Sequence, residues 1–129
     1  MSRFLLDTSV VLWIVSSGDK IPARVRRALS SPDAELYVSV ASAWEVVLKH
    51  QAGKLVLGIG LEEILDQILY RSPWTMLPIA SQHLPLLAAL PIVHKDPFDR
   101  IMIAQAQFEG LTLITPDKQI RRYKVPTLW

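Results

Sequence analysis

The sequence predicts an α/β fold, a three-layer α/β/α sandwich whose central sheet is mostly parallel. Short apolar segments alternate along the chain with longer segments that have the spacing of helices. The short segments are continuous apolar runs rather than alternations of apolar and polar residues, as is typical of strands covered on both faces. The length of 129 residues suits one hydrophobic core, so we expect a single domain over residues 1–129.

Turn and capping residues divide the first half of the chain into elements. A strand ends at Asp7, the helix after it ends at Gly18-Asp19, and Pro22 begins a second helix. Ser39 is placed to cap a longer helix. The elements expected in this half are a strand at 3–6, helices at 8–15 and 22–29, a strand at 35–39, and helices at 40–51 and 61–70.

Prolines and glycines mark the elements of the second half. Asp96-Pro97 is a strong helix start, because an acid at the cap position precedes a proline in the first turn, and Gly110 ends this helix. Pro85 weakens the helical pattern around it. The expected elements are a strand at 75–78, a helix at 81–90, a helix from 97 up to Gly110, and strands at 111–114 and 125–128.

The overall charge identifies no partner by itself. The chain has 14 basic and 12 acidic side chains, and a net charge of +2 indicates nucleic-acid binding only if the basic residues cluster. Either of the clusters present also fits an ordinary solvated face. The first cluster lies on a predicted helix and the second near the C-terminal end: Arg24, Arg26 and Arg27; Lys118, Arg121, Arg122 and Lys124.

The cysteine count and the hydropathy pattern bear on the compartment. Without cysteine the chain has no disulfide and no thiolate metal site, which suits the reducing cytoplasm, where we expect the protein. Asp7 interrupts the only apolar N-terminal segment, so no secretory leader is expected. The longest apolar stretch, 84–93, contains two prolines and is too short to cross a bilayer. The hydrophobic share of 50% leaves apolar surface for a partner.

Two acids follow strands that should be buried on both faces. Asp7 comes directly after the first strand, and Asp117 follows the strand at 111–114 through Thr115-Pro116. In a parallel sheet both acids would project from one edge, where ligands bind in folds of this class. Each acid could instead cap a neighbouring helix or turn, a role worth about 1 kcal/mol that requires no ligand.

Three further acids lie in or beside predicted helices. The small residues before Glu45 would leave room for a ligand above its carboxylate, whereas the alternative is an exposed pair with Lys49 one turn later. Asp99 lies in the first turn of its helix, where the helix dipole alone would explain it. Asp96 is more typical of an N-cap than of a ligand.

As a set, four of these acids indicate a divalent cation: Asp7, Glu45, Asp99 and Asp117. Carboxylates a few ångströms apart resist ionising together unless a cation offsets their repulsion. A carboxylate site without cysteine or paired histidines suits Mg²⁺ or Mn²⁺ rather than Zn²⁺, and such sites commonly hydrolyse phosphodiesters. The histidines lack the spacing of metal ligands and are expected to be structural or surface residues: His50, His83 and His94.

Four segments, in order along the chain, resemble the motifs of PIN-domain ribonucleases. They are 4–9 around Asp7, 39–45 ending in Glu45, 94–106 with its run from Asp96 to Arg100, and 111–117 ending in Asp117. The resemblance covers essentially the whole chain. The short length and the form of the third motif are similar to the toxins of VapBC toxin–antitoxin pairs.

This resemblance implies a Mg²⁺- or Mn²⁺-dependent endoribonuclease that cleaves RNA, has a cognate VapB-type antitoxin and forms a homodimer. It assigns the acidic quartet, Asp7, Glu45, Asp99 and Asp117, to catalysis and metal binding. It implies that three neighbours support the quartet: Thr8, Asp96 and Thr115. Three basic residues beside the acids are expected to contact RNA: Arg100, Lys118 and Arg121. An apolar groove is expected to receive the antitoxin, with candidates Trp13, Trp44 and Leu48.

Three alternatives differ from this interpretation at identifiable features. A phosphatase of the haloacid dehalogenase type would need a second Asp two positions after Asp7, where Ser9 stands. A P-loop nucleotide hydrolase would need a glycine-rich phosphate loop, which the sequence lacks. A catalytically inactive PIN-like module that binds RNA or a protein stays open, and metal-dependent cleavage would distinguish it.

Overall fold

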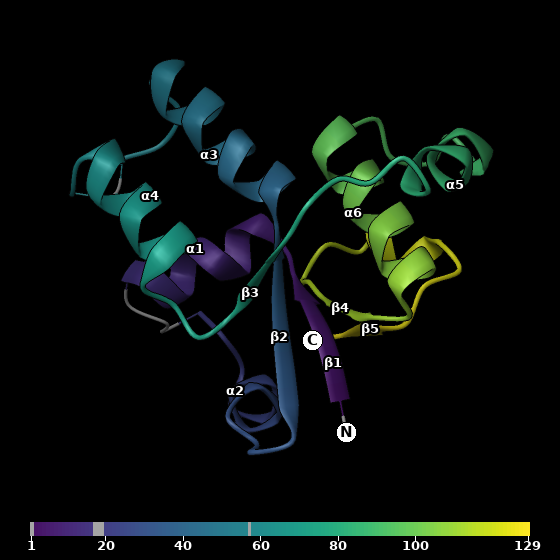
Figure 1. Ribbon diagram of the computed structural model, residues 1–129, viewed down its shortest axis with the longest axis horizontal. Helices are drawn as coiled ribbons and strands as arrows, with labels where there is room; N and C mark the ends of the chain where they lie inside the picture. The colour runs from purple at the N-terminus through teal and green to yellow at the C-terminus, as the bar shows by residue number, and fades with distance from the viewer. Residues whose placement is uncertain (1, 17–19, 57) are drawn as a thin grey trace.

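The computed structural model describes residues 2–16, 20–56 and 58–129. Within these ranges the chain forms five strands and six α-helices (Figure 1). The strands are β1 (Ser2–Leu6), β2 (Ala34–Ser39), β3 (Thr75–Leu77), β4 (Thr112–Ile114) and β5 (Thr127–Leu128). The helices are α1 (Thr8–Ser16), α2 (Ala23–Leu29), α3 (Val40–Gln51), α4 (Leu61–Tyr70), α5 (His83–Ala89) and α6 (Pro97–Glu109), with a short 3₁₀ turn, η1, at Ile120–Arg122.

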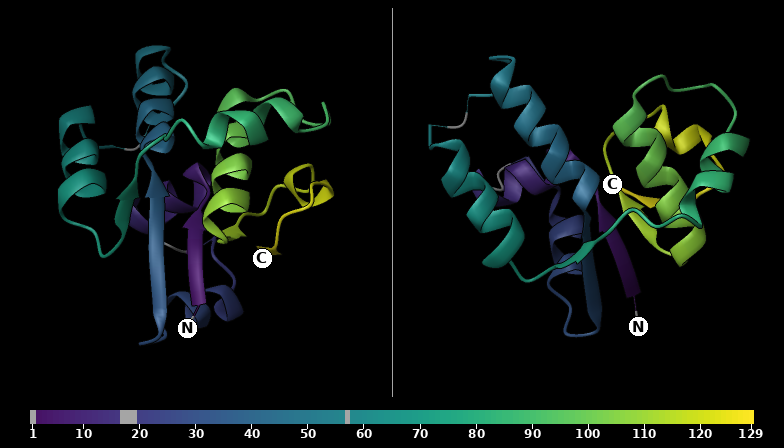
Figure 2. Two further views of the ribbon diagram at one scale, coloured as in Figure 1. Left: turned by 45° about the vertical axis from the view of Figure 1, so that its right-hand side comes forward. Right: turned by 45° about the horizontal axis from the view of Figure 1, so that its top comes forward.

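The sheet confirms the predicted α/β architecture. Its strand order is β3-β2-β1-β4-β5, and every pairing in the described part of the chain is parallel. Because successive strand residues face opposite sides, Leu6 packs with Val11 and Ile64 on one face, and Leu5 packs with Met102 and Ile103 on the other. The two views in Figure 2 likewise show α1, α3 and α4 on one side of the sheet and α5 and α6 on the other, which makes three layers.

Several expected helix ends are confirmed by their hydrogen bonds. The Ala41 N–H donates to Ser39 Oγ over 3.0 Å at the start of α3. Gly110 ends α6 with a φ of 69°, a left-handed conformation that a residue with a side chain rarely adopts. Helix α5 begins at His83, later than expected, so that Pro85 lies in its first turn, where its missing N–H breaks no helical bond. The expected helix end at Gly18-Asp19 lies outside the described residues.

The strand register brings the ends of β1 and β4 together. Leu6 is paired with Ile114, and the next residue, Asp7, donates its N–H to the Ile114 carbonyl over 3.0 Å. Strand β2 runs directly into α3, and α3 packs against both α1 and α6. The N-terminal parts of three helices therefore meet at the carboxyl edge of the sheet. Among the described helices, none combines the length and the apolar character needed to cross a bilayer.

Candidate functional site

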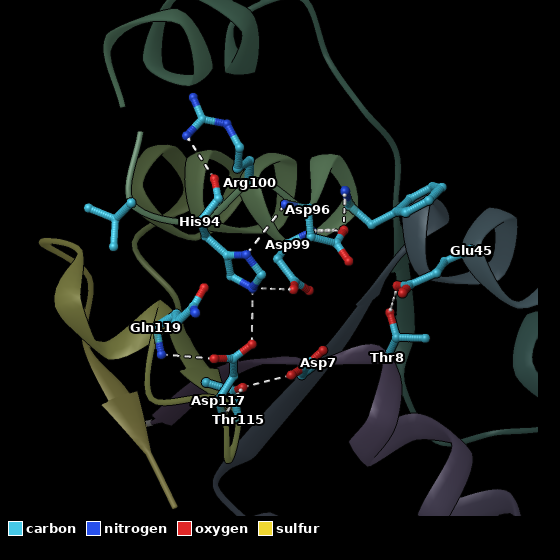
Figure 3. A network of polar contacts seen from close by, with 12 residues as sticks. Asp7, Thr8, Glu45, His94, Asp96, Asp99, Arg100, Thr115, Asp117 and Gln119 are labelled. Carbon is cyan, nitrogen blue, oxygen red and sulfur yellow. Dashed lines mark hydrogen bonds and ion pairs between the residues drawn. The ribbon is translucent and has the colours of Figure 1, made fainter. Parts of the chain in front are cut away.

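A cleft of about 530 Å³ opens at this edge of the sheet. Its lining contains five acids, which come from the end of β1, from α3, from the start of α6 and from the segment after β4: Asp7, Glu45, Asp96, Asp99 and Asp117. The structure thus places all four acids of the predicted quartet in one cleft (Figure 3). Their role in catalysis stays a prediction.

Asp7 occupies the N-cap position of α1, and its side chain lines the cleft. Its carbonyl accepts the first helical hydrogen bond from the Val11 N–H over 3.0 Å, and its Oδ2 accepts the Thr115 hydroxyl over 2.6 Å. Burial raises the pKa of the Asp7 carboxyl; the hydrogen bond from Thr115 opposes this rise, and the charge of Glu45 adds to it. The backbone position is that of a cap, but the side chain is held by a residue 108 positions away.

Asp117 uses its two carboxylate oxygens differently. Oδ1 accepts the Gln119 N–H over 2.8 Å, so the turn-capping role that the sequence left open is present. Oδ2 faces the cleft (Figure 3). The Asp117 N–H also donates to Thr115 Oγ1 over 3.0 Å. One threonine hydroxyl therefore orients both Asp7 and Asp117, which agrees with its expected supporting position.

Glu45 is 3% exposed and is held from two sides. The Thr8 hydroxyl donates to its Oε1 over 2.6 Å, and Lys49 Nζ lies 2.6 Å from its Oε2. The pairing of Glu45 with Lys49 one turn later is therefore present, but the expectation of an exposed pair is wrong for Glu45, because its carboxylate is buried and faces the cleft. Burial lowers the pKa of Lys49, but the hydrogen bond and charge of Glu45 outweigh this effect and raise it.

Asp96 and Asp99 have different positions at the start of α6: Asp96 caps the helix, and Asp99 lies in its first turn. Asp96 caps the helix, because its Oδ1 accepts the N–H groups of Phe98 (2.9 Å) and Asp99 (3.2 Å). Asp99 points into the cleft, and its burial raises the pKa of its carboxyl to about 8, with the charges of nearby acids, Asp7 first, adding to the rise. This carboxyl therefore resists ionisation in the protein as it stands.

His94 was expected to be a structural or surface residue, and the structure places its ring against two acids of the predicted quartet, a contact that the sequence did not predict. Its Nε2 lies 2.8 Å from Asp99 Oδ2 and 3.0 Å from Asp117 Oδ2 (Figure 3). The Asp96 N–H donates to Nδ1 over 3.3 Å, which puts the ring proton of the neutral form on Nε2, between the two acids. His94, Asp99 and Asp117 bring their ligand atoms within 4.8 Å of one another.

The other histidines do not contact the acids of the quartet. His83 is fully buried, accepts the Ala80 N–H at Nδ1 and contacts Glu109 through Nε2, so its expected structural role agrees with its contacts. His50 is half-buried in the last turn of α3. His94 lies two residues before the cap of α6, and this position was the one signal in the sequence that could have placed it near Asp99.

The basic residues are arranged differently from the expectation. Arg100 points away from the acids, and its guanidinium donates to backbone carbonyls, the shortest contact being 3.0 Å to Pro91. Lys118 and Arg121 are exposed and do not line the cleft. Among the described residues, the cations that line it are Lys49 and Lys54. The expected RNA contacts of Arg100 therefore lack a supporting geometry.

Comparisons with known proteins agree with this description. The family model of the PIN domain matches residues 4–126. Ribonuclease VapC22 of Mycobacterium tuberculosis is 26% identical over 134 residues, which span 100% of both chains.

Solved structures share the fold at low sequence identity. The structure of VapBC2 from Rickettsia felis, bound to a DNA fragment from its promoter, aligns with a TM-score of 0.73 and 13% identity over 98% of this chain and 97% of that chain. DNA-bound VapBC from Salmonella typhimurium aligns with a TM-score of 0.70 and 18% identity over 99% and 98%. VapC20 of Mycobacterium tuberculosis, described as a Sarcin-Ricin loop cleaving toxin, aligns with a TM-score of 0.66 and 13% identity over 95% of each chain.

Proposed function

The chain belongs to the PIN-domain family, and from this premise we propose that it is a divalent-cation-dependent endoribonuclease and the toxin of a VapBC-type pair. The observation that carries the proposal is the convergence of the quartet, Asp7, Glu45, Asp99 and Asp117, in one cleft. RNA as the substrate is supported by the name of the 26% identical relative, a ribonuclease. RNA cleavage that requires added Mg²⁺ or Mn²⁺ tests the proposal, and cation-independent RNA binding without cleavage would favour the inactive module instead.

The charges in the cleft fit a divalent cation. Among the described residues that line it, five acids face two lysines, and one of these, Lys49, is already paired with Glu45. Burial raises the pKa of Asp99, the excess of nearby acids raises it further, and a cation would oppose both effects by favouring the ionised carboxylate. Asp7, Asp99 and Asp117 would hold the ion with Glu45 completing the set, and carboxylate oxygens suit Mg²⁺ or Mn²⁺.

When bound, such a cation supplies the polarisation of water and phosphodiester that hydrolysis needs. The chain itself supplies orientation. Thr115 fixes the carboxylate of Asp7, and Thr8 fixes that of Glu45, each through a 2.6 Å hydrogen bond. In the observed arrangement His94 donates its Nε2–H to the acids and presents no lone pair on that atom to a metal. We therefore assign His94 to holding Asp99 and Asp117 together rather than to binding the ion.

Replacing His94 by Ala should lower the melting temperature of the metal-free protein by several degrees, because the buried carboxylate of Asp99 and the half-buried carboxylate of Asp117 lose the N–H between them. Saturating Mg²⁺ should largely remove this deficit, since the cation takes over the neutralising role. Thermal unfolding in EDTA and in Mg²⁺ measures both, with His50→Ala as the control outside the cleft. If His94→Ala lowers the melting temperature equally in EDTA and in Mg²⁺, His94 contributes only packing and does not hold the two acids together.

An antitoxin should cover the apolar patch formed by Trp44, Leu48 and Phe98. Trp44 is 56% exposed and Leu48 42% exposed, and the Trp44 ring meets the Phe98 ring edge-on at 5.1 Å. The patch adjoins the cleft through α3, so a segment lying on it could place a cation among the acids. Trp13, expected in the same groove, lines the cleft and packs on Trp129 instead.

Co-expression with the product of the neighbouring reading frame should give a stable complex that relieves toxicity. Trp44→Arg should break this complex while RNA cleavage survives, because the change buries a charge in the interface without touching the acids. Tyr70→Arg, at a 79% exposed position on α4, is the matched control. A complex that withstands Trp44→Arg would exclude this patch as the docking surface. The predicted homodimer is a separate question that sedimentation of the free protein decides.

A further inference from the structure

A second hollow, of about 270 Å³, is lined by two arginines from different parts of the chain. Arg24 comes from α2 and Arg121 from η1, and Thr127, Leu128 and Trp129 complete the lining. Both arginines are exposed, and no ion pair within the described residues engages either of them. Among the described residues that line this hollow, none is an acid. A pair of guanidinium groups is suited to phosphate, because the planar fork of arginine matches phosphate oxygens.

Two tryptophans connect this arginine hollow with the acidic cleft. Trp13 lines the cleft and Trp129 lines the hollow, and their ring centroids lie 5.7 Å apart at an interplanar angle of 47°. Lys20 adds a cation along the contact, with its Nζ 5.6 Å from the centroid of the Trp13 ring. Aromatic rings interleaved with basic groups are the combination that binds single-stranded nucleic acid, since bases stack on the rings and the cations follow the backbone.

We propose that single-stranded RNA leaves the cleft across Trp13 and Trp129 and places a backbone phosphate in the hollow between Arg24 and Arg121. This inference rests on the proposed ribonuclease function and extends it by assigning a path to the strand beyond the cleaved bond. Stacking and phosphate contacts read no base sequence, so this surface fixes affinity and register rather than sequence preference.

Each of the two basic clusters of the sequence has members inside and outside the arginine hollow. One member of each cluster, Arg24 and Arg121, reaches the hollow. Arg122, the neighbour of Arg121, lines a different hollow beside Leu86 and Lys124. Arg27 is exposed on α2 and does not line the arginine hollow. The chain therefore offers a matched pair of double variants with the same loss of charge on the same two elements.

The test compares Arg24→Gln/Arg121→Gln with Arg27→Gln/Arg122→Gln in the full chain. Binding of a fluorescent oligouridylate of about 12 nucleotides, within the range of single-strand sites, is measured by anisotropy in EDTA, where no metal-dependent cleavage occurs. The first double variant should weaken binding about tenfold at low salt and flatten the salt dependence, by about 0.7 in logarithmic slope for each phosphate that the variant no longer neutralises. The second should bind within about twofold of wild type.

Equal losses in the two double variants would show that net charge alone matters and would overturn the path. So would a wild-type affinity for RNA in Arg24→Gln/Arg121→Gln. Free phosphate is the other source of the same group: saturable binding of inorganic phosphate that those substitutions abolish, with RNA binding unchanged, would assign the hollow to the free ion and overturn the path. Loss of a co-expressed partner with unchanged RNA affinity would assign it to a protein, with the same consequence.

These outcomes separate the path from the function on which it rests. If wild type cleaves RNA with metal but the two double variants bind RNA equally well, the proposed RNA path is wrong and the proposed nuclease function stands. Wild-type protein that neither binds nor cleaves RNA defeats the proposed function, and the path with it.

Discussion

Replacing Asp7 by Asn should abolish metal-dependent RNA cleavage and leave the metal-free protein at least as stable as wild type. The change keeps the shape of the side chain, the hydrogen bond from Thr115 and the N-cap position of α1, where Asn is as good as Asp. It removes one charge that the cation needs, and the loss of cleavage should exceed the ~100-fold limit seen for residues that merely support metal ligands. It also removes a buried charge that destabilises the folded protein. The raised pKa of Asp7, caused first by burial and then by the charge of Glu45, reflects this destabilisation.

The measurements for Asp7→Asn are cleavage of single-stranded RNA in Mg²⁺ or Mn²⁺ and thermal unfolding in EDTA. Asp33→Asn makes the same chemical change at an exposed acid outside the cleft and should alter neither. If Asp7→Asn has a lower melting temperature than wild type but cleaves RNA at the wild-type rate, the role of Asp7 is purely structural. The nuclease proposal would then lose its most central acid.

Asp99→Asn should stabilise the metal-free protein, and increasingly so as the pH rises. In the folded protein the Asp99 carboxyl keeps its proton up to a pKa of about 8, whereas the unfolded chain releases it at the ordinary value of 3.8. Between these values the folded state binds more protons than the unfolded state, so the stability of wild type falls as the pH rises. The slope for this one group is at most about 1.4 kcal/mol per pH unit. Asn does not titrate and escapes this loss.

Urea unfolding in EDTA at a series of pH values between the two pKa values, 3.8 and about 8, measures this difference. The stability gap between Asp99→Asn and wild type should widen across the series, and Asp33→Asn should run parallel to wild type. Saturating Mg²⁺ should reverse the gap, because the cation stabilises the ionised carboxylate that only wild type has. A gap that stays constant with pH would mean that Asp99 is already ionised without metal.

The backbone framework was largely predictable because it depends on local signals. Apolar runs, caps and glycine stops placed each element within a few residues of its observed bounds. The proximity of Asp7 and Asp117 followed from the parallel order alone, since acids after adjacent strands must share an edge. The position of Glu45 and Asp99 at the same edge could be predicted only from the family resemblance, because local sequence patterns do not determine how helices pack.

Side chains on loops and long-range contacts were not predictable in the same way. His94 lies in the segment before α6, which has no periodicity, and the direction of its ring depends on the backbone N–H of Asp96. Arg100 follows Asp99 directly, but one residue along a helix turns the side chain by about 100°, and Arg100 reaches the carbonyl of Pro91 instead of the acids. The contact of Trp13 with Trp129 joins nearly the two ends of the chain and carries no local signature.

Removal and restoration of the divalent cation tests the central claim most directly. Wild-type protein stripped with EDTA should not cleave single-stranded RNA, and added Mg²⁺ or Mn²⁺ should restore cleavage and raise the melting temperature over the same concentration range. Asp7→Asn should show neither response, because it lacks one of the carboxylates that we propose to hold the ion. Cleavage that continues undiminished in EDTA, or a wild-type protein whose cleavage and melting temperature both ignore the cation, would contradict the account.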